Sequence, residues 1–196
     1  GLRTEYLTQL QTDLRADIDA AKSSERVAWD RVAAVVDIFA TAGLEPPLAE
    51  IFVHGEVATA PTLPEFGYDY PYAPNHVLTY VETFGEPRDT FEAIGSNGHF
   101  QLMESPQVVR ALQQYYRKVE AAQDMDQAVV EIFRRLTEMR SRHGISLGGR
   151  TTLDDLAAAV KVDQQLAAEL ETYFMNSGVQ AVRMLEIQLA AASLIE

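Results

Sequence analysis

The chain has 196 residues, no cysteine, and 29 acidic residues against 16 Lys plus Arg, which gives a formal charge of −13. This length suits one domain or at most two small ones, and 47% apolar residues suffice for a core without disulfides or structural metals. An acidic chain with no local Lys/Arg cluster disfavours binding to nucleic acid or anionic lipid. The absence of cysteine excludes a thiol nucleophile and a thiolate zinc site.

Proline and glycine divide the chain into regions, because both residues break regular structure. Seven of the eight prolines lie between Pro46 and Pro87, whereas long stretches before and after contain neither residue. No run of 18 apolar residues that would span a bilayer occurs. We therefore expect a single helical domain over 1–196, with a long N-terminal helical arm over 2–42, a loop-rich segment over 45–98 and a helical region over 105–196.

The first stretch has apolar residues spaced by three and four, which predicts a helix. A continuous helix of this length would be about 60 Å long, more than the diameter of a compact domain, so it either projects or breaks. The polar residues 22–26 are the expected place for a kink, and Gly43 is the expected C-terminal cap. The apolar positions are Leu7, Leu10, Leu14, Ile18, Ala21, Ala28, Val32, Val35, Phe39 and Ala42.

Capping signals predict three further helices after residue 104. Ser105 and Pro106 read as the N-cap and first residue of one helix, and Asp124 with Gln127 as a capping box that opens the next. Gly144 ends that helix. Thr152 and Asp155 begin a last helical arm, which Gly178 is expected to interrupt.

These elements predict an all-α fold, an antiparallel bundle of about four long helices plus short helices, with a Pro/Tyr-rich irregular middle segment. In that segment, residues 51–53 and 77–81 read as short strands or short helices, since brief apolar runs do not distinguish the two. Residues 90–94 predict one or two helical turns. Little or no sheet is expected.

No pattern of catalytic or metal-binding residues stands out. His54, His76, His99 and His143 lie far apart in the sequence, and no His-x-x-x-His or Glu-x-x-His pattern occurs. The calcium-loop pattern that begins at Asp124 fails at its third oxygen position. Residues 147–152, LGGRTT, read as an anion-binding nest or, more simply, as a turn. We therefore predict no catalytic residue, no metal, no cofactor and no enzymatic activity.

The most distinctive non-helical feature is an alternating row of aromatic residues, Phe66, Tyr68, Tyr70 and Tyr72. In an extended backbone these four rings share one side. They then either attach the segment to the helices or form a partner or ligand surface, since tyrosine is enriched at interfaces.

Two segments of the chain resemble a known family. The opening EYLTQLQTDLRADI and the central TFEAIGSNGHFQLMESPQVVRALQQYYRKV resemble an uncharacterised family of small bacterial single-pass membrane-anchored proteins, a domain of unknown function. The Pro- and Tyr-rich insertion over 61–74 departs from that pattern. The matching central residues are Thr90, Phe91, Ser96, Gly98, Leu102, Met103, Leu112, Tyr115 and Tyr116.

The resemblance implies that a transmembrane helix precedes Gly1. It also implies that this chain is the soluble, periplasmic part, at the extracytoplasmic face of a bacterial inner membrane. The family brings no catalytic residues.

Three functions follow as hypotheses. The first is a non-enzymatic domain for protein–protein interaction or self-association. The second is a small-molecule sensor with a ligand pocket under the 45–98 segment, with Arg88, His99 and the aromatic row as contacts. The third is an enzyme whose dispersed Glu, His and Tyr residues show no recognisable spacing.

Overall fold

The computed structural model describes residues 1–47, 50–53, 56–59, 84, 89–103, 105–145 and 151–195. Apart from one short hairpin, the described residues form an all-α fold, as predicted. Three helices are long: α1 (Leu2–Ala42), α4 (Pro106–Ser141) and α6 (Gln164–Ile195). The short elements are strands β1 (Glu50–Val53) and β2 (Glu56–Thr59), helix α3 (Asp89–Ser96), the 3-10 helix η2 (His99–Leu102) and helix α5 (Leu153–Val162).

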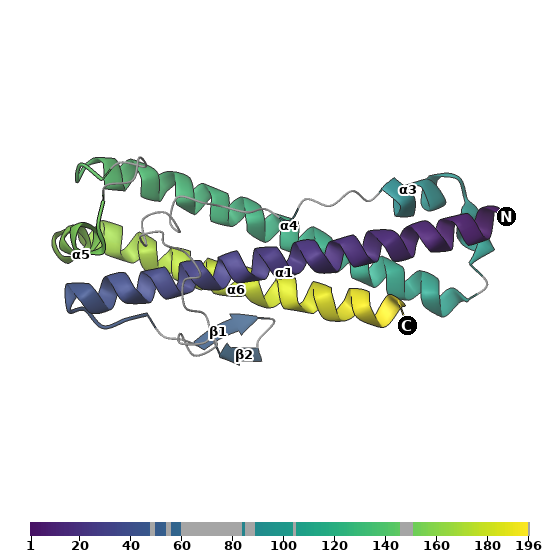
Figure 1. Cartoon of the computed structure of the whole chain (residues 1–196), viewed down its shortest axis with the longest axis horizontal. Helices are drawn as coiled ribbons and strands as arrows, with labels where there is room; N and C mark the ends of the chain where they lie inside the picture. The colour runs from purple at the N-terminus through teal and green to yellow at the C-terminus, as the bar shows by residue number, and fades with distance from the viewer. Residues whose placement is uncertain are drawn as a thin grey trace.

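The long helices lie side by side in an elongated bundle, with α6 antiparallel to both α1 and α4 (Figure 1). Both termini lie at the same end of the bundle. Leu10 of α1 shares a buried cluster there with Leu112 of α4 and Ala191 of α6. Helices α1 and α4 thus run in the same direction, both starting at the end of the bundle that holds the termini. The described residues thus contain three long helices, where about four were expected.

Helix α1 is continuous, with no break at the polar residues 22–26. Glu25 explains how this part joins the bundle: its carboxylate accepts hydrogen bonds from Trp29 Nε1 (3.4 Å) and from Gln188 Nε2 of α6 (2.5 Å). The predicted cap is confirmed, because Gly43 has φ 71° and its amide donates to the carbonyl of Ala40 (3.1 Å).

Helix α4 corrects the prediction of two helices between residues 105 and 143. The start at Ser105 and Pro106 is confirmed, but Asp124 and Gln127 lie exposed in the middle of a single 36-residue helix. Val119 and Val129, on either side of Asp124, are both buried on the face that packs on the bundle. Because that face continues in phase, nothing favours a break.

The last arm breaks at Asp163 rather than at Gly178. Thr152 and Asp155 form the predicted capping box at the start of α5. Asp163 Oδ1 then accepts the backbone amides of Gln165 (3.0 Å) and Leu166 (3.1 Å), so an aspartate caps α6. Gly178 is buried inside an uninterrupted helix.

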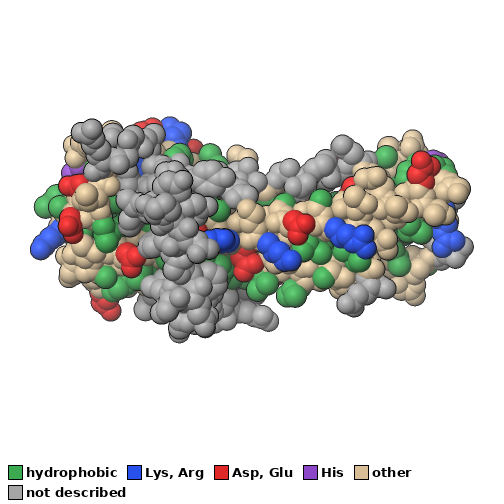
Figure 2. Space-filling view, viewed as in Figure 1, with side chains coloured by type: hydrophobic (Ala, Val, Ile, Leu, Met, Phe, Trp, Pro, Cys, Tyr) green, Lys and Arg blue, Asp and Glu red, His purple; other side chains and the backbone are tan. Residues whose placement is uncertain are grey.

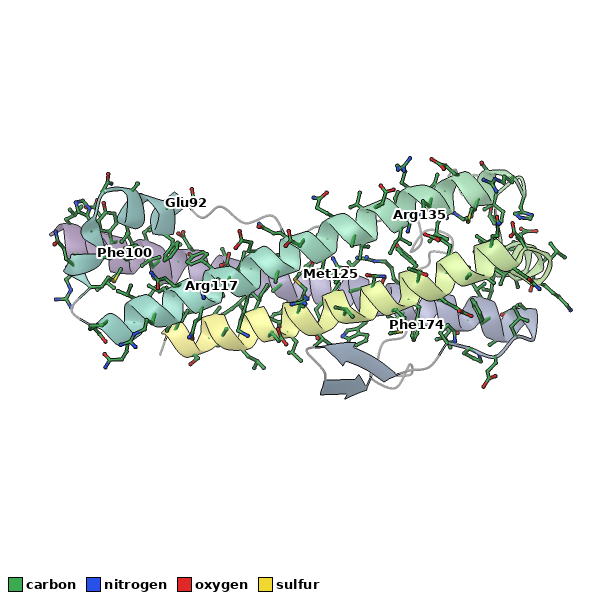
Figure 3. The ribbon with its side chains drawn as sticks, turned by 180° about the vertical axis from the view of Figure 1, so that it is seen from behind. Glu92, Phe100, Arg117, Met125, Arg135 and Phe174 are labelled. Carbon is green, nitrogen blue, oxygen red and sulfur yellow. The ribbon has the colours of Figure 1, made fainter. Side chains whose placement is uncertain are left out.

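The core consists of two hydrophobic clusters along the bundle. One, near α5, includes Trp29, Leu136, Leu156 and Phe174; the other, near the termini, includes Leu14 and further residues of all three long helices. In Figure 3, Arg135 and Phe174 lie in the α5 half, and Phe100 and Arg117 lie toward the other end.

The described parts of the 45–98 segment agree in part with expectation. Residues 51–53 lie in strand β1, which pairs with β2 in antiparallel register (Glu50 opposite Thr59) and packs against α6. The helix expected over 90–94 is α3, which extends from Asp89 to Ser96. The expectation for 77–81 lies outside the described residues.

Candidate functional site

A buried polar cluster occupies the junction of the two hydrophobic clusters. Arg31 of α1 and Gln180 of α6 are both 0% exposed, and Asp126 of α4 is 2% exposed. Arg31 Nη1 donates to Gln180 Oε1 (3.0 Å), and Gln180 Nε2 donates to Asp126. The backbone amide of Phe84, from the 45–98 segment, donates to the other carboxylate oxygen of Asp126 (2.5 Å). One network therefore joins the three long helices to that segment.

Two arginines lie near Tyr173 of α6, which is completely buried. The guanidinium carbon of Arg31 is 5.9 Å from the centre of the Tyr173 ring. The buried Arg140 of α4 donates to Thr137 Oγ1 (3.2 Å), and its charge also acts on Tyr173. Burial raises the pKa of the Tyr173 hydroxyl, and the positive charges of Arg31 and Arg140 oppose that rise. The cluster is therefore a buried, positively charged environment.

Burial also dominates the ionisation of the acidic member of the cluster. The pKa of Asp126 is raised by desolvation, while the hydrogen bonds from Phe84 and Gln180 and the charge of Arg31 lower it. Desolvation lowers the pKa of Arg140. Burial thus disfavours the charged forms of Asp126 and Arg140, as expected inside a low-dielectric core.

The raised pKa of Asp126 predicts a definite pH dependence of stability. The folded state holds the proton more tightly than the unfolded state, so this stabilisation is complete below the ordinary value of 3.8 and is lost as pH rises through the folded pKa. We expect the free energy of unfolding of the wild type, measured relative to Asp126→Asn, to fall as pH rises above that value. Urea denaturation followed by circular dichroism at a series of pH values measures it.

The exposed Asp124 on the same helix provides the control, because Asp124→Asn should change stability by less than about 0.5 kcal/mol. A wild-type advantage over Asp126→Asn that grew with rising pH would contradict this assignment.

The cluster was missed from the sequence, although a signal was available. Arg31 lies three residues after Ala28 and four before Val35, and so falls within the predicted apolar face of its helix. Asp126 has the corresponding place between Ala122 and Val129. Charged residues at stripe positions on two helices were a usable signal of a buried pair.

Of the residues predicted to form a partner or ligand surface, His99 alone is described. Phe66, Tyr68, Tyr70, Tyr72 and Arg88 lie outside the described residues. His99 is half-buried, and its Nδ1 lies 2.9 Å from the hydroxyl of Tyr6 on α1. That contact is at the terminal end of the bundle, so His99 does not join the buried polar cluster.

An open pocket of about 600 Å³ lies at the α5 end of the bundle. Beside it, His143 Nε2 contacts Asp163 Oδ2 (2.8 Å), and this hydrogen bond is the largest cause of the lowered pKa of Asp163. Within the described ranges, no three His, Asp or Glu side chains are grouped to hold a metal ion. The pocket lining includes His143, Ile145, Thr151, Asp155, Ala159 and Val162.

An exposed apolar stripe follows the C-terminal half of α6. It consists of Val182, Leu185, Leu189 and Ala192, which are spaced by three, four and three residues and hence share one side of the helix. Leu185, Leu189 and Ala192 are exposed, whereas Val182 is half-buried and packs against the hydrophobic cluster near α5. Leu185 is 43% exposed and Leu189 is 65% exposed. We call these four residues the α6 stripe. The opposite side of the same turns, with Met184, Ile187 and Ala191, is completely buried in the bundle.

Helix α6 is also the one helix among the described residues that is long and apolar enough to cross a membrane. Of its most apolar 18-residue window, 33% is buried in the bundle. The helix packs along both α1 and α4. Helix α6 therefore has more apolar residues than are buried in the core of its own chain.

The visible molecular face carries acidic and basic side chains interspersed among apolar ones (Figure 2).

Comparisons with protein families, curated proteins and solved structures found no match to this chain. The resemblance to a membrane-anchored family therefore remains a prediction.

Proposed function

We propose that this chain is a non-enzymatic helical domain whose function is protein–protein interaction, in the first place self-association through the α6 stripe. The observation that supports the proposal is the exposure of Leu185 and Leu189 on a regular apolar face of the central helix. Isolated surface leucines are ordinary, but four apolar residues in heptad-like spacing are typical of helix pairing.

Pairing through this stripe has a defined geometry. Two copies related by a two-fold axis would place their α6 helices side by side, stripe against stripe, with α1 and α4 of each copy on the outer sides of the pair. The stripe spans 11 residues, or about 15 Å of helix. Such a small contact favours weak association, which is promoted by high protein concentration.

The charge of the chain gives this association a salt dependence. Each copy carries −13, so two copies repel each other at low ionic strength. Because added salt screens that repulsion and strengthens apolar contact, the dimer fraction should rise with sodium chloride. An association driven by ion pairs would show the opposite trend.

Substitution of the stripe tests the proposal by molar mass. Multi-angle light scattering should show a concentration-dependent dimer for the wild type and a monomer for Leu185→Glu/Leu189→Glu, because each glutamate would have to be buried at the contact. Val162→Glu is the matched control, since Val162 is 76% exposed at the other end of the bundle and should leave the dimer intact. A wild type that stays strictly monomeric at high concentration, with no partner crosslinked in cells through residue 189, would contradict the proposal.

The cellular setting is proposed on the family resemblance alone: a periplasmic domain anchored to a bacterial inner membrane by a preceding transmembrane helix. The full open reading frame tests it. An apolar span of about 20 residues upstream of Gly1 would support the anchor, and its absence would contradict it.

The sensor alternative has one specific observation in its favour. Phe84 belongs to the 45–98 segment, under which the sensor hypothesis assumes a ligand pocket, and its amide donates to Asp126 in the buried polar network. A metabolite panel with thermal denaturation as readout tests this alternative, since a bound ligand stabilises the folded state. If no compound raises the melting temperature, the sensor alternative is contradicted.

A further inference from the structure

The guanidinium of Arg31 has hydrogen-bond donors that the described residues do not satisfy. Nη1 is bound to Gln180, but Nε and Nη2 have no acceptor within the described part of the chain, although the side chain is 0% exposed. The hydroxyl of Ser177, also 0% exposed, has no hydrogen-bond partner among the described residues. The completely buried Tyr173 hydroxyl lies next to the Arg31 guanidinium. Buried polar atoms without partners are costly, so a molecule that supplies acceptors here would be stabilised.

The two unsatisfied atoms of Arg31 form one edge of the guanidinium plane. Their N–H bonds point the same way and nearly in parallel, which is the geometry that binds both oxygens of a carboxylate. Arg31 stands over the Tyr173 ring, and Ser177 lies one turn farther along α6 on the same side as Tyr173. The two hydroxyls and the guanidinium edge thus belong to one buried region between α1 and α6.

We propose that the Nε/Nη2 edge of Arg31 binds the carboxylate of a small aliphatic monocarboxylate, with the Tyr173 and Ser177 hydroxyls as further donors. Asp126, linked to Arg31 through Gln180, disfavours a second negative charge and so selects a monoanion. Ala28 and Val35, each within one turn of Arg31 on α1, and Ala181, next to Gln180 on α6, belong to the buried hydrophobic cluster, so a short alkyl group would meet apolar neighbours.

This inference gives the sensor alternative a ligand class, and it is independent of self-association through the α6 stripe. The two proposals fail separately, since one is measured by molar mass and the other by carboxylate-dependent stability. Simple carboxylates could raise the melting temperature while the wider metabolite panel does not. That outcome would support the carboxylate site and show that none of the metabolites tested is its ligand.

The experiment uses the full chain, refolded in sodium formate, acetate, propionate or butyrate at constant ionic strength, so that access to an enclosed site is not limiting. Sodium chloride, sulfate and phosphate are the comparison salts. We expect the melting temperature to rise with carboxylate concentration beyond the effect of chloride at equal ionic strength, as for any ligand of the folded state. Phosphate as the best ligand would overturn the assignment to a monocarboxylate.

Variants assign the effect to the guanidinium edge. Arg31→Lys keeps the charge but loses the fork and should bind acetate about tenfold more weakly, with Ser177→Ala as a milder second variant. Arg135→Lys, at a half-exposed arginine paired with Glu169 on the bundle surface, is the control and should bind as the wild type does. If Arg31→Lys does not fold, the loss in Ser177→Ala and NMR saturation transfer to labelled acetate keep the site testable. Equal effects of chloride and acetate, equal affinity in Arg31→Lys, or only water at the Arg31 edge of a crystal grown in acetate would overturn the proposal.

Discussion

Asp126→Ala should lower the free energy of unfolding by about 3–5 kcal/mol, the range for removal of one partner from a buried charged network. Asp126 accepts hydrogen bonds from the Phe84 amide and from Gln180, and these bonds and the Arg31 charge oppose the rise of its pKa that burial causes. Truncation leaves two buried donors and a buried guanidinium without that carboxylate. Urea denaturation followed by the fluorescence of Trp29, the single tryptophan, measures the change.

Asp124→Ala is the control, two residues away on the same helix and exposed, and it should cost less than about 0.5 kcal/mol. Asp126→Asn should lie between the two, because the amide retains an acceptor oxygen for Phe84 but loses the charge. If Asp126→Ala lowered the free energy of unfolding no more than Asp124→Ala does, the buried network would not contribute to the stability of the fold.

The second large effect is expected nearer the N-terminal end of α6, at Phe174. Phe174 is 1% exposed and belongs to the hydrophobic cluster near α5, so Phe174→Ala should cost about 3–5 kcal/mol through lost burial and a cavity. Leu189→Ala should change the stability of the monomer by less than about 0.5 kcal/mol, because its side chain is 65% exposed. Thermal or urea denaturation at low protein concentration measures both.

This pair of substitutions separates two roles of one helix. A large loss at Phe174 with almost none at Leu189 identifies the first as core and the second as available for contact. A loss at Leu189 comparable to that at Phe174 would show that the α6 stripe is part of the monomer core.

Local signals in the sequence predicted helix ends well. The three-and-four spacing from Leu7 to Ala42 and the cap at Gly43 gave the bounds of α1, because both depend on neighbouring residues only. The same holds for the start of α4 at Ser105 and Pro106 and for the capping box at the start of α5.

Ambiguous caps were predicted less well. Asp124 with Gln127 matches a capping box, yet it lies in an exposed part of a continuous helix, where such residues are simply solvated. No glycine or proline lies near Asp163, so the positions of helix-breaking residues do not predict the helix start that Asp163 caps. Capping patterns indicate a helix start only where the apolar face also changes phase, as it does between α5 and α6.

The arrangement of the helices and the buried polar cluster depend on tertiary contacts that a local reading does not contain. The sequence contains no local signal that α1 and α4 run in the same direction. Arg31 and Gln180 are 149 residues apart, and their contact unites two stripes that were each assigned to apolar packing. The exposure of Leu185 and Leu189 depends on tertiary contacts in the same way, since helical spacing alone does not show which apolar side chains the neighbouring helices cover.

The most direct test of the proposed self-association uses the absence of cysteine, because one introduced thiol is then the single reactive site. Leu185→Cys or Leu189→Cys, treated with a flexible bismaleimide at high protein concentration, should give a crosslinked dimer whose yield rises with salt. Val162→Cys, more exposed at 76% but remote from the α6 stripe, should give little. Equal yields at all three positions, or no dimer at residues 185 and 189, would contradict association through the stripe.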